Sequence, residues 1–310
     1  MTIVDRLLDR CDFPPRGTAV ELGVSGGADS SALLVLAVAA GCEVTAVHVD
    51  HGLRASSAGE AERVAALAAR YGARFRRTRV DVEEGPNLEA RARAARYRVL
   101  GADALVGHTL DDRAETVLLH LLRGTGAAGF AALAPPDPRR PLLRLRRSET
   151  VALCAAEGID VVDDASNDDG RFARNRVRHE VLPLLDAISG RDTAVLLTRT
   201  ADLIAADDRL LDDCAARLDP TDAPALAAAP EPLATRRLRS WLAPVHDGYA
   251  PDAAEIERVL DVARGLATAT ELVGGARVAR TRQTLRIEAR GDGDGPTPSP
   301  GSPRGNMKPA

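Results

Sequence analysis

The sequence predicts an α/β fold, namely a doubly wound parallel sheet followed by a smaller, mainly helical domain. Over the first part of the chain, short apolar runs alternate with amphipathic runs of helical length, which indicates repeated strand–helix units. A glycine-rich turn, Ser25 to Ser30, separates the first apolar run from the second. Repeated units of this kind form right-handed crossovers, so we expect a parallel sheet with helices on both faces.

Four strand–helix units support that prediction in order along the chain. We expect strands at residues 18–24, 43–49, 73–80 and 104–107, and helices at residues 30–40, 58–71, 88–100 and 111–122. In parallel sheets of this class, ligands bind beyond the carboxyl ends of the strands. The glycine-rich turn, the segment His48 to His51 and the pair Gly107-His108 all fall at that edge, so three sequence signals predict one active site there.

The second half of the chain is expected to be mainly helical. Helices are expected at residues 148–157, with Ser148 near the cap, and at 174–185, 192–218, 231–242 and 252–262. Residues 186–191 look like a boundary, and short antiparallel strands are expected at 271–273, 276–280 and 284–288. We therefore expect a first domain at residues 1–186, a smaller domain at 191–290 and a disordered tail rich in Gly, Pro and Ser at 291–310.

The composition is that of a soluble globular protein. Of the 310 residues, 45% are hydrophobic and 28% are charged, and no apolar run approaches the roughly 20 residues that span a bilayer. The N-terminus contains acids and no signal-peptide core, so we expect a cytoplasmic protein without membrane contact. The four cysteines are scattered and form no CxxC pair, which argues against zinc or iron–sulfur ligation.

The turn Ser25-Gly26-Gly27-Ala28-Asp29-Ser30 has the properties of an anion-binding site. Unpaired amide groups and the positive end of the helix dipole point to the same place, the glycines allow close backbone approach, and the serines add hydroxyl donors. An acid beside a phosphate repels it unless a magnesium ion lies between them, so Asp29 is the candidate magnesium ligand. A plain strand–turn–helix connection is the alternative.

Two further strings carry candidate site residues. Asp112 and Glu115 are three residues apart and share a face at the start of a helix, and clustered acids near a phosphate loop suit magnesium or an amino group. First-turn acids favoured by the helix dipole are the alternative interpretation. The string His48 to Arg54 ends a strand, and its two histidines have no evident third ligand for zinc.

Positive charge is carried almost entirely by arginine, since Lys308 is the one lysine in the chain. The net charge is −4 at pH 7, yet residues 139–147 carry five arginines and residues 171–179 carry four. Two such clusters beside a nucleotide fold indicate contact with a phosphate backbone, with a solvated charged face as the alternative for either one. Arg93, in the helix expected at 88–100, shares a face with Arg96.

These strings resemble one known family. SGGADS is similar to the SGGxDS loop of the PP-loop ATP pyrophosphatases, and HVDHGLR, GHTLDDRAET followed by RGTG, RPLL, and RNRVRHEVLP are similar to segments of the lysidine synthetases within that family. The resemblance covers about residues 18–185 and implies a PP-loop, adenine nucleotide alpha hydrolase-like fold. The chain departs at Gly107-His108-Thr109, where many members carry Ala-His-His, which leaves the role of position 109 open.

The resemblance implies ATP-dependent ligation of L-lysine to the wobble cytidine of the CAU anticodon in tRNA(Ile). ATP would adenylate the ring carbonyl oxygen of the cytidine, and the lysine amine would then displace AMP. The implied cofactors are ATP and Mg²⁺, and the implied partners are tRNA(Ile) and L-lysine, with a homodimer left open. Another PP-loop tRNA modifier, such as a cytidine thiolase, is the alternative, although its paired cysteines are missing, and a non-catalytic nucleotide sensor is the third.

The resemblance also assigns roles to residues of this chain. The residues expected to bind ATP are Ser25, Gly26, Gly27, Ala28, Asp29 and Ser30, with Val47 and His48 beside the adenine. Asp112 and Glu115 are expected to hold the ammonium group of lysine, and Arg93 is expected to contact phosphate or substrate. The residues expected to bind tRNA are Arg144, Arg174, Asn175, Arg176 and Arg178.

Overall fold

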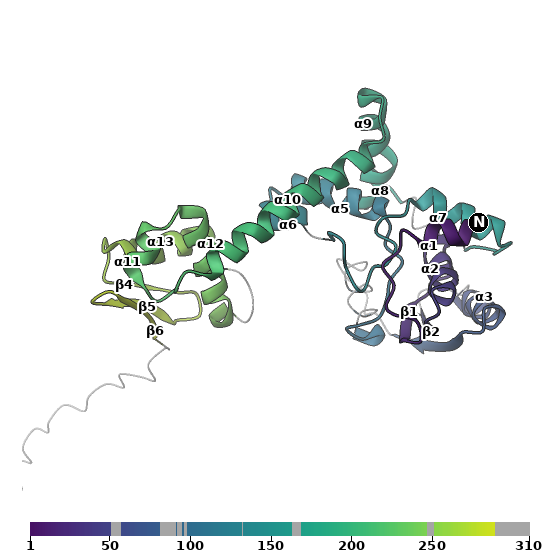
Figure 1. Cartoon of the computed structure of the whole chain (residues 1–310), viewed down its shortest axis with the longest axis horizontal. Coiled ribbons are helices and arrows are strands. Elements are labelled where there is room, and N and C mark those ends of the chain that lie inside the picture. The colour runs from purple at the N-terminus through teal and green to yellow at the C-terminus, as the bar shows by residue number, and fades with distance from the viewer. Residues whose placement is uncertain are drawn as a thin grey trace, which may run out of the picture. The chain divides into compact units, whose positions relative to one another are not determined.

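The computed structural model describes residues 1–50, 57–80, 91, 95, 98–131, 133–162, 169–246 and 251–288. The chain divides into two compact units, Met1–Ala206 and Asp207–Ala310, and each is described by itself (Figure 1). Most of the helix expected at 88–100, including Arg93, and the expected tail at 291–310 lie outside the described residues. Among the described helices, none has the length and apolar character that crossing a membrane requires.

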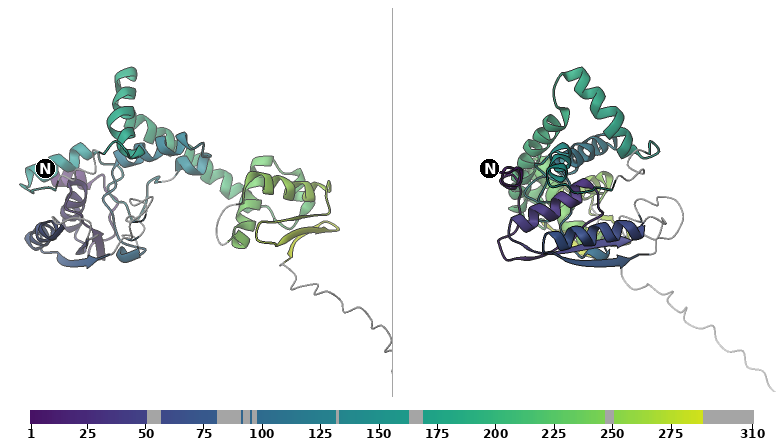
Figure 2. Two further views of the ribbon diagram at one scale, coloured as in Figure 1. Left: turned by 180° about the vertical axis from the view of Figure 1, so that it is seen from behind. Right: turned by 90° about the vertical axis from the view of Figure 1, so that its right-hand side faces the viewer.

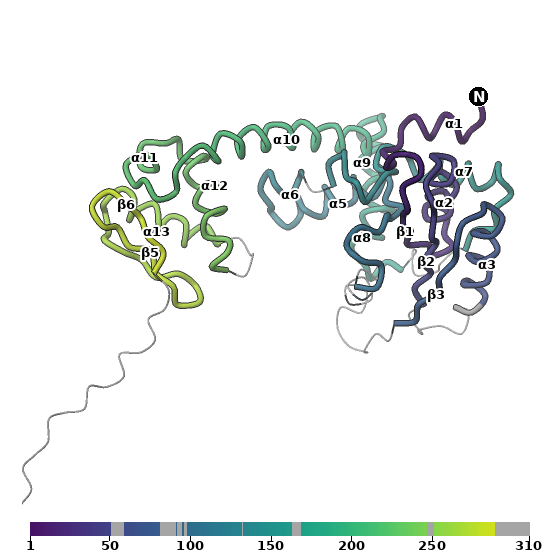
Figure 3. The backbone as a smooth tube through the Cα atoms, turned by 60° about the horizontal axis from the view of Figure 1, so that its bottom comes forward, coloured from purple at the N-terminus to yellow at the C-terminus, as the bar shows by residue number. Residues whose placement is uncertain are grey.

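The parallel sheet predicted from the sequence is confirmed in the first unit (Figure 3). Its strands pair in parallel in the spatial order β1 (Ala19–Gly23), β2 (Glu43–Asp50) and β3 (Arg74–Arg79). Strand β2 buries both of its faces, since Val44 and Ala46 pack into one apolar cluster and Val47 packs into another. Burial on both faces is typical of a strand inside an α/β sheet.

The strand expected at residues 104–107 is reduced to one parallel bridge beside β1. Leu105 bridges Leu22, on the side of β1 that β2 does not occupy. The pairing stops there because the Val106 N–H donates to the Arg139 carbonyl oxygen at 2.9 Å. Strand β1 therefore has a neighbour on each side, and its carboxyl end is a topological switch point, where sheets of this class bind their ligands.

Four helices pack on the sheet through one apolar core. They are α1 (Ile3–Leu8), α2 (Ala28–Ala39), α3 (Ser57–Arg70) and α7 (Arg147–Ala156). Leu33, Leu34 and Leu36 of α2 are fully buried, and a helix that is apolar nearly all round is expected in such a position. The sequence did not predict α1. It placed the cap of α7 near Ser148, but the N-cap is Arg146, whose backbone N–H donates to the Glu149 carboxylate.

A second apolar cluster joins α5 (Leu110–Leu122), the π-helical turn η2 (Val177–Val181), α9 (Leu182–Ser189) and α10 (Thr193–Ala216). Two short helices, α6 (Ala127–Ala131) and α8 (Ala173–Arg176), belong to the same unit. Ala114 and Leu118 of α5 pack with Val177 of η2, which brings the two elements face to face. The helix expected at 174–185 continues to Ser189 and ends where Gly190 takes φ +63°. The division between the two units falls within α10.

The second unit packs helices against a small antiparallel sheet, as the sequence predicts (Figure 2). Its elements are α11 (Ala223–Ala228), α12 (Glu231–Leu242), η3 (Ala243–His246), α13 (Ala253–Arg264), β4 (Ala269–Glu271), β5 (Arg277–Thr281) and β6 (Thr284–Glu288). Leu238, Val259 and Leu285 are fully buried in its core. The sequence missed α11, which begins at Ala223 after the N-cap Asp222 and carries a proline at its second position.

The backbone at Gly107 lies so close to the backbone of α2 that a larger residue would not fit there. A Cβ on Gly107 would lie 2.7 Å from the Asp29 carbonyl oxygen and 3.2 Å from the Ser30 nitrogen. We therefore expect Gly107→Ala to lower the free energy of unfolding in urea by about 1–3 kcal/mol, as overpacking does.

Gly59→Ala in α3 is the matched control for this substitution. Nothing described lies within 4 Å of a Cβ on Gly59, and alanine is favoured over glycine inside a helix by about 1 kcal/mol. The control is therefore expected to unfold at an equal or higher urea concentration than the unsubstituted chain. Equal stability of Gly107→Ala and the unsubstituted chain would contradict the close approach.

Candidate active site

The glycine-rich turn between β1 and α2 is closed by its own serines. The Ser25 N–H donates to Ser30 Oγ at 3.2 Å, and Ser30 Oγ donates to the Gly27 carbonyl oxygen at 3.0 Å. Gly26 takes φ +91°, and a Cβ there would lie 3.0 Å from Val162 Cγ2. Gly27 is the N-cap of α2, and among the described residues no side chain caps this helix end. The first amide groups of α2 are therefore available to an anion.

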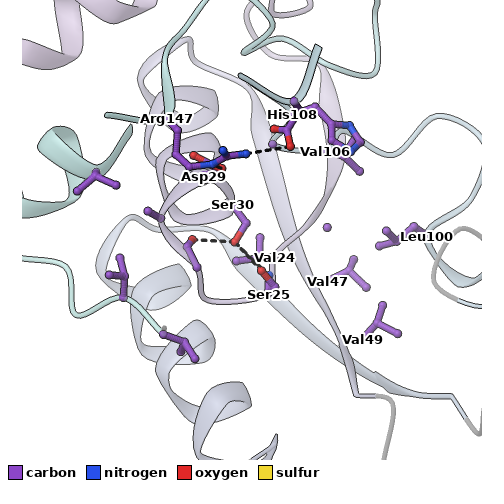
Figure 4. Close-up of a pocket in the computed structure, with 18 of the residues that line it drawn as sticks. Val24, Ser25, Asp29, Ser30, Val47, Val49, Leu100, Val106, His108 and Arg147 are labelled. Atoms are coloured by element: carbon purple, nitrogen blue, oxygen red, sulfur yellow. Dashed lines mark hydrogen bonds and ion pairs between the residues drawn. The ribbon is translucent and has the colours of Figure 1, made fainter. Parts of the chain in front are cut away.

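A cavity of about 560 Å³ opens over this turn (Figure 4). One part of its lining is apolar and is made by Val24, Val47, Val49, Leu100 and Val106. The other part is polar and includes Ser25, Asp29, Ser30, His108, Asp112, Arg147 and Arg178. The volume lies within the usual range for small-molecule sites, and the two kinds of wall match a ligand with one apolar and one charged end.

Asp29 faces the polar part of the cavity from the first turn of α2. Its Oδ2 accepts from Arg147 Nε at 3.2 Å, and its Oδ1 accepts from the Thr150 hydroxyl of α7. Burial raises the pKa of the Asp29 carboxyl above its ordinary value, although Thr150 and Arg147 oppose that rise. A cation placed at this carboxylate would therefore stabilise its ionised form.

Arg147, the first residue of α7, joins three carboxylates from two other helices. Besides Asp29, its Nη2 lies 3.0 Å from Asp112 Oδ1 and its Nη1 lies 3.2 Å from Glu115 Oε1. Burial lowers the pKa of the guanidinium group, but the three carboxylates outweigh it and raise that pKa above its ordinary value. The sequence did not single out Arg147, whose only signal was its membership of the basic segment 139–147.

Glu115 is fully buried and is bound by further arginines. Arg178 Nε donates to Glu115 Oε1 at 2.7 Å, and Arg174 Nε lies 3.5 Å from Glu115 Oε2. Arg174 also donates to the Thr116 hydroxyl at 2.8 Å. Both arginines were expected to bind tRNA, but in this structure they turn inward to the acid that was expected to hold lysine.

Asp112 is the third residue of α5 and forms a capping box with Thr109. Its Oδ2 accepts from the Thr109 N–H at 2.8 Å and from the Thr109 hydroxyl at 2.9 Å. Burial would raise the pKa of Asp112, but Arg147, His108 and the Thr109 N–H outweigh it and lower that pKa below its ordinary value. Position 109, which the sequence left open, therefore serves to cap α5 and to orient Asp112.

The other residues expected to bind tRNA point elsewhere. Arg176 is 61% exposed and pairs with Glu180, and Arg144 is 49% exposed and pairs with Asp12. Asn175 is buried, and its amide donates to the Asp169 carbonyl oxygen at 3.0 Å. Of the five residues expected to bind tRNA, Arg144 and Arg176 thus point outward, Arg174 and Arg178 point inward, and Asn175 binds a backbone carbonyl group.

The structure places His48 away from the cavity. Side chains alternate along a strand, so Val47 and Val49 face the cavity while His48 points to the opposite face of β2. The buried His48 ring donates from Nδ1 to the Val24 carbonyl oxygen at 3.0 Å, which ties β2 to the start of the turn. Residues 51–54 of the string His48 to Arg54 lie outside the described residues, as does Arg93.

The oxygen ligands present suit magnesium better than a transition metal. Within the described ranges, no group of three or more His, Cys, Asp or Glu side chains could hold a metal ion by itself. Magnesium instead takes one or two carboxylates together with phosphate oxygens. Asp29 and Asp112 both line the cavity, so the donor set fits that requirement.

The chain is similar in sequence to known proteins over most of its length. Residues 3–185 match the sequence profile of the PP-loop domain. The tRNA(Ile)-lysidine synthase of Nocardia farcinica is 42% identical over 307 residues, covering 90% of this chain and 95% of that protein. The tRNA(Ile)-lysidine synthase of Mycobacterium leprae is 41% identical over 291 residues, covering 88% of each chain.

A solved structure supports the fold. The U34-tRNA thiolase NcsA of Methanococcus maripaludis superposes with a TM-score of 0.52, covering 66% of this chain and 76% of that one. The two sequences are 16% identical, so this likeness concerns the fold alone. It agrees with the doubly wound sheet described above.

Removing Arg147 is expected to destabilise the first unit. Arg147→Met leaves the buried Asp112 and Glu115 and the partly buried Asp29 without their shared guanidinium group, and we expect the free energy of unfolding at pH 7 to fall by about 3 kcal/mol. Arg176→Met, which removes an exposed partner of Glu180, is the control and should change it by less than about 1 kcal/mol.

The pH dependence of this effect has a definite sign. The Arg147 guanidinium helps to hold the pKa of Asp112 below 3.8, so its stabilisation is present above pH 3.8 and is lost as the pH falls through the lower folded-state pKa. The difference between Arg147→Met and the unsubstituted chain should therefore narrow below pH 3.8. A difference that stays constant over that range would refute the charge origin of the effect.

Proposed function

The chain belongs to the tRNA(Ile)-lysidine synthases of the PP-loop family, and on that premise we propose how its residues perform the reaction. The enzyme is a ligase that forms lysidine in tRNA(Ile) at the expense of ATP. We propose that L-lysine is the amine, that the wobble cytidine of a CAU anticodon is the acceptor, and that an adenylated cytidine is the intermediate. The observation that carries this proposal is the meeting of carboxylates and arginines beside an uncapped helix N-terminus.

ATP would occupy the cavity with its adenine against the apolar wall. Val47, Val49 and Val106 supply that wall, and the amides at the start of α2 supply donors for the triphosphate. The contact with adenine that the sequence assigned to His48 then falls to Val47 and Val49. Ser25 and Ser30 contribute hydroxyl groups at the same turn.

Magnesium would be held by Asp29 together with phosphate oxygens of ATP. When bound, the ion neutralises negative charge on the phosphates as pyrophosphate leaves. Partial burial disfavours the ionised form of Asp29 and raises its pKa, and a cation beside the carboxylate would offset that cost. Thr150 and Arg147 keep the Asp29 side chain oriented before the nucleotide arrives.

The reaction would proceed in two displacements. The carbonyl oxygen of the cytidine attacks the α-phosphorus of ATP, and pyrophosphate leaves. The ε-amine of lysine then attacks the ring carbon that bears this oxygen, and AMP leaves with the oxygen. The amine has to lose a proton before it attacks, and Asp112 and Glu115 are the carboxylates placed to orient the ammonium group and take that proton. The protein contributes mainly positioning and charge neutralisation.

The binding of lysine would require an arginine to leave. Asp29, Asp112 and Glu115 together carry three negative charges, and Arg147, Arg174 and Arg178 together carry three positive charges. A lysine ammonium group would add a fourth positive charge to a buried cluster that is already neutral, which is unfavourable.

Arg174 and Arg178 are the arginines that can leave. They belong to the basic segment 171–179, and tRNA phosphates offer them an alternative partner. We therefore propose that tRNA draws these side chains away from Glu115 and so opens the lysine site. We further propose that the protein is cytoplasmic and that its second unit contacts tRNA. Whether the chain forms a homodimer is left open.

Asp29 is expected to be essential for adenylation. Asp29→Ala should abolish both pyrophosphate release and the transfer of labelled lysine to tRNA(Ile), while the far-ultraviolet circular dichroism stays unchanged. Asp9→Asn, at an exposed aspartate that ends α1, is the control and should be fully active. Near-normal turnover of Asp29→Ala would exclude Asp29 from the reaction. ATP binding without ATP consumption or lysine transfer in the unsubstituted chain would favour the sensor alternative.

The outward arginines are expected to bind tRNA electrostatically. Arg144→Glu and Arg176→Glu should each weaken tRNA binding and reduce the slope of log K against log salt by about 1 per lost phosphate contact. Arg6→Glu, an equal charge change at an exposed residue of α1, is the control and should leave the slope unchanged. An unchanged slope in all three variants would count against this surface.

A further inference from the structure

We propose that the backbone N–H of Val162 positions the glycine-rich turn for ATP, because it holds the peptide between Gly26 and Gly27 with its N–H towards the phosphates. The inference rests on the ATP-binding role proposed above. It concerns a residue that neither the sequence motifs nor the family resemblance singled out, and it concerns a backbone group rather than a side chain.

Val162 follows α7 in the chain and packs directly on the glycine-rich turn. Its N–H donates to the Gly26 carbonyl oxygen at 2.9 Å. The packing is close, since a Cβ on Gly26 would lie 3.0 Å from Val162 Cγ2, and a Cβ on Gly27 would lie 3.8 Å from the Val162 carbonyl oxygen. The turn and Val162 are far apart in the sequence, so this contact exists only in the folded chain.

The hydrogen bond from Val162 determines where the next N–H points. The carbonyl group of Gly26 and the N–H of Gly27 belong to one planar trans peptide, so they point in opposite directions. The Gly27 N–H is therefore directed away from the Val162 backbone. Gly27 lines the cavity of the candidate active site, whereas Gly26 lines a separate cavity of about 220 Å³, which agrees with this orientation. No described residue accepts the Gly27 N–H, so this group is available to a phosphate oxygen.

Without Val162, the peptide between the two glycines would be free to turn over. Gly26 takes φ +91°, and glycine adopts positive and negative φ with little difference in energy. A turned peptide would aim the partially negative carbonyl oxygen of Gly26 at the phosphates and would take the Gly27 N–H away from them. It would also break the hydrogen bond from Val162, so this bond favours the orientation that binds ATP.

The chain that leads to Val162 is anchored to the rest of the first unit. Ile159 packs against the apolar core of this unit. At the end of α3, Arg70 Nη2 donates to the Glu157 carbonyl oxygen at 2.6 Å, and the Tyr71 hydroxyl donates to Glu157 Oε2 at 2.8 Å. Val162 is therefore held in place in the absence of nucleotide, and the turn is oriented before ATP binds, which lowers the cost of binding.

Replacing one amide by an ester tests this inference without changing any side chain. In the full-length chain, Val162 is replaced by its α-hydroxy acid, so that an ester oxygen takes the place of the N–H. We expect the Kd for ATP in the presence of Mg²⁺ to rise by about 10-fold, which is the effect of one hydrogen bond beside a charged ligand. A crystal structure of the unsubstituted chain with α,β-methylene ATP should show the Gly27 N–H donating to a phosphate oxygen.

Two control variants separate this effect from a general loss of stability or packing. The same replacement at Val273 removes the hydrogen bond from its N–H to Glu255 Oε1, at 2.8 Å in the second unit, and should leave the Kd for ATP unchanged. Val162→Ala keeps the N–H and removes the two methyl groups, so it should bind ATP nearly as tightly as the unsubstituted chain. The far-ultraviolet circular dichroism of all three variants should match that of the unsubstituted chain.

Three binding results would each overturn the inference: an unchanged Kd for ATP in the Val162 ester, an equal rise in the Val273 ester, or an equal rise in Val162→Ala. A Gly26 carbonyl oxygen that faces the phosphates in the crystal structure would also overturn it. If the unsubstituted chain binds ATP but forms no lysidine, the proposed function fails, whereas the ATP affinities of the variants still decide the role of Val162.

Discussion

Three carboxylates converge at one place in the first unit, and Arg147 is the one guanidinium group that the structure pairs with all three of them. Asp29 comes from α2, and Asp112 and Glu115 come from α5, while Arg147 begins α7. Unpaired, these acids would repel one another and would be costly to bury. The guanidinium group therefore links the helices that form the polar wall of the cavity, and the acids that we propose as catalytic are oriented without any substrate.

The same electrostatic constraint gives the arginines different tasks. In a chain with a single lysine, guanidinium groups have to make both the internal ion pairs and the contacts with phosphate. Arg174 and Arg178 face Glu115, while Arg176, on the same short stretch, faces solvent. Because the side chains alternate in direction, this one basic segment would serve both the candidate active site and the proposed tRNA surface. It also offers a physical link between the binding of tRNA and access to the acids.

Close backbone packing completes the site on the side of the nucleotide. Gly107 lets the chain approach α2 within van der Waals distance, and this approach sets His108 beside the glycine-rich turn. Arg140 then fixes the imidazole, just as Thr109 fixes Asp112 and Thr150 fixes Asp29. Each group at the polar wall thus has a neighbour that orients it, which is the arrangement that positioning and charge stabilisation require.

Hydrophobic periodicity and glycine turns are local signals, so the amino-acid sequence alone predicts the order of strands and helices, the parallel sheet and the edge where we expect the site. It also selected Asp29, Asp112 and Glu115, since short motifs preserve their spacing. The partners of these side chains are visible only in the folded chain: Arg147 joins the acids, Arg178 turns inward, and His48 faces away from the cavity. These outcomes depend on contacts between residues far apart in the chain and on which face of an element is buried, and no local pattern contains that information.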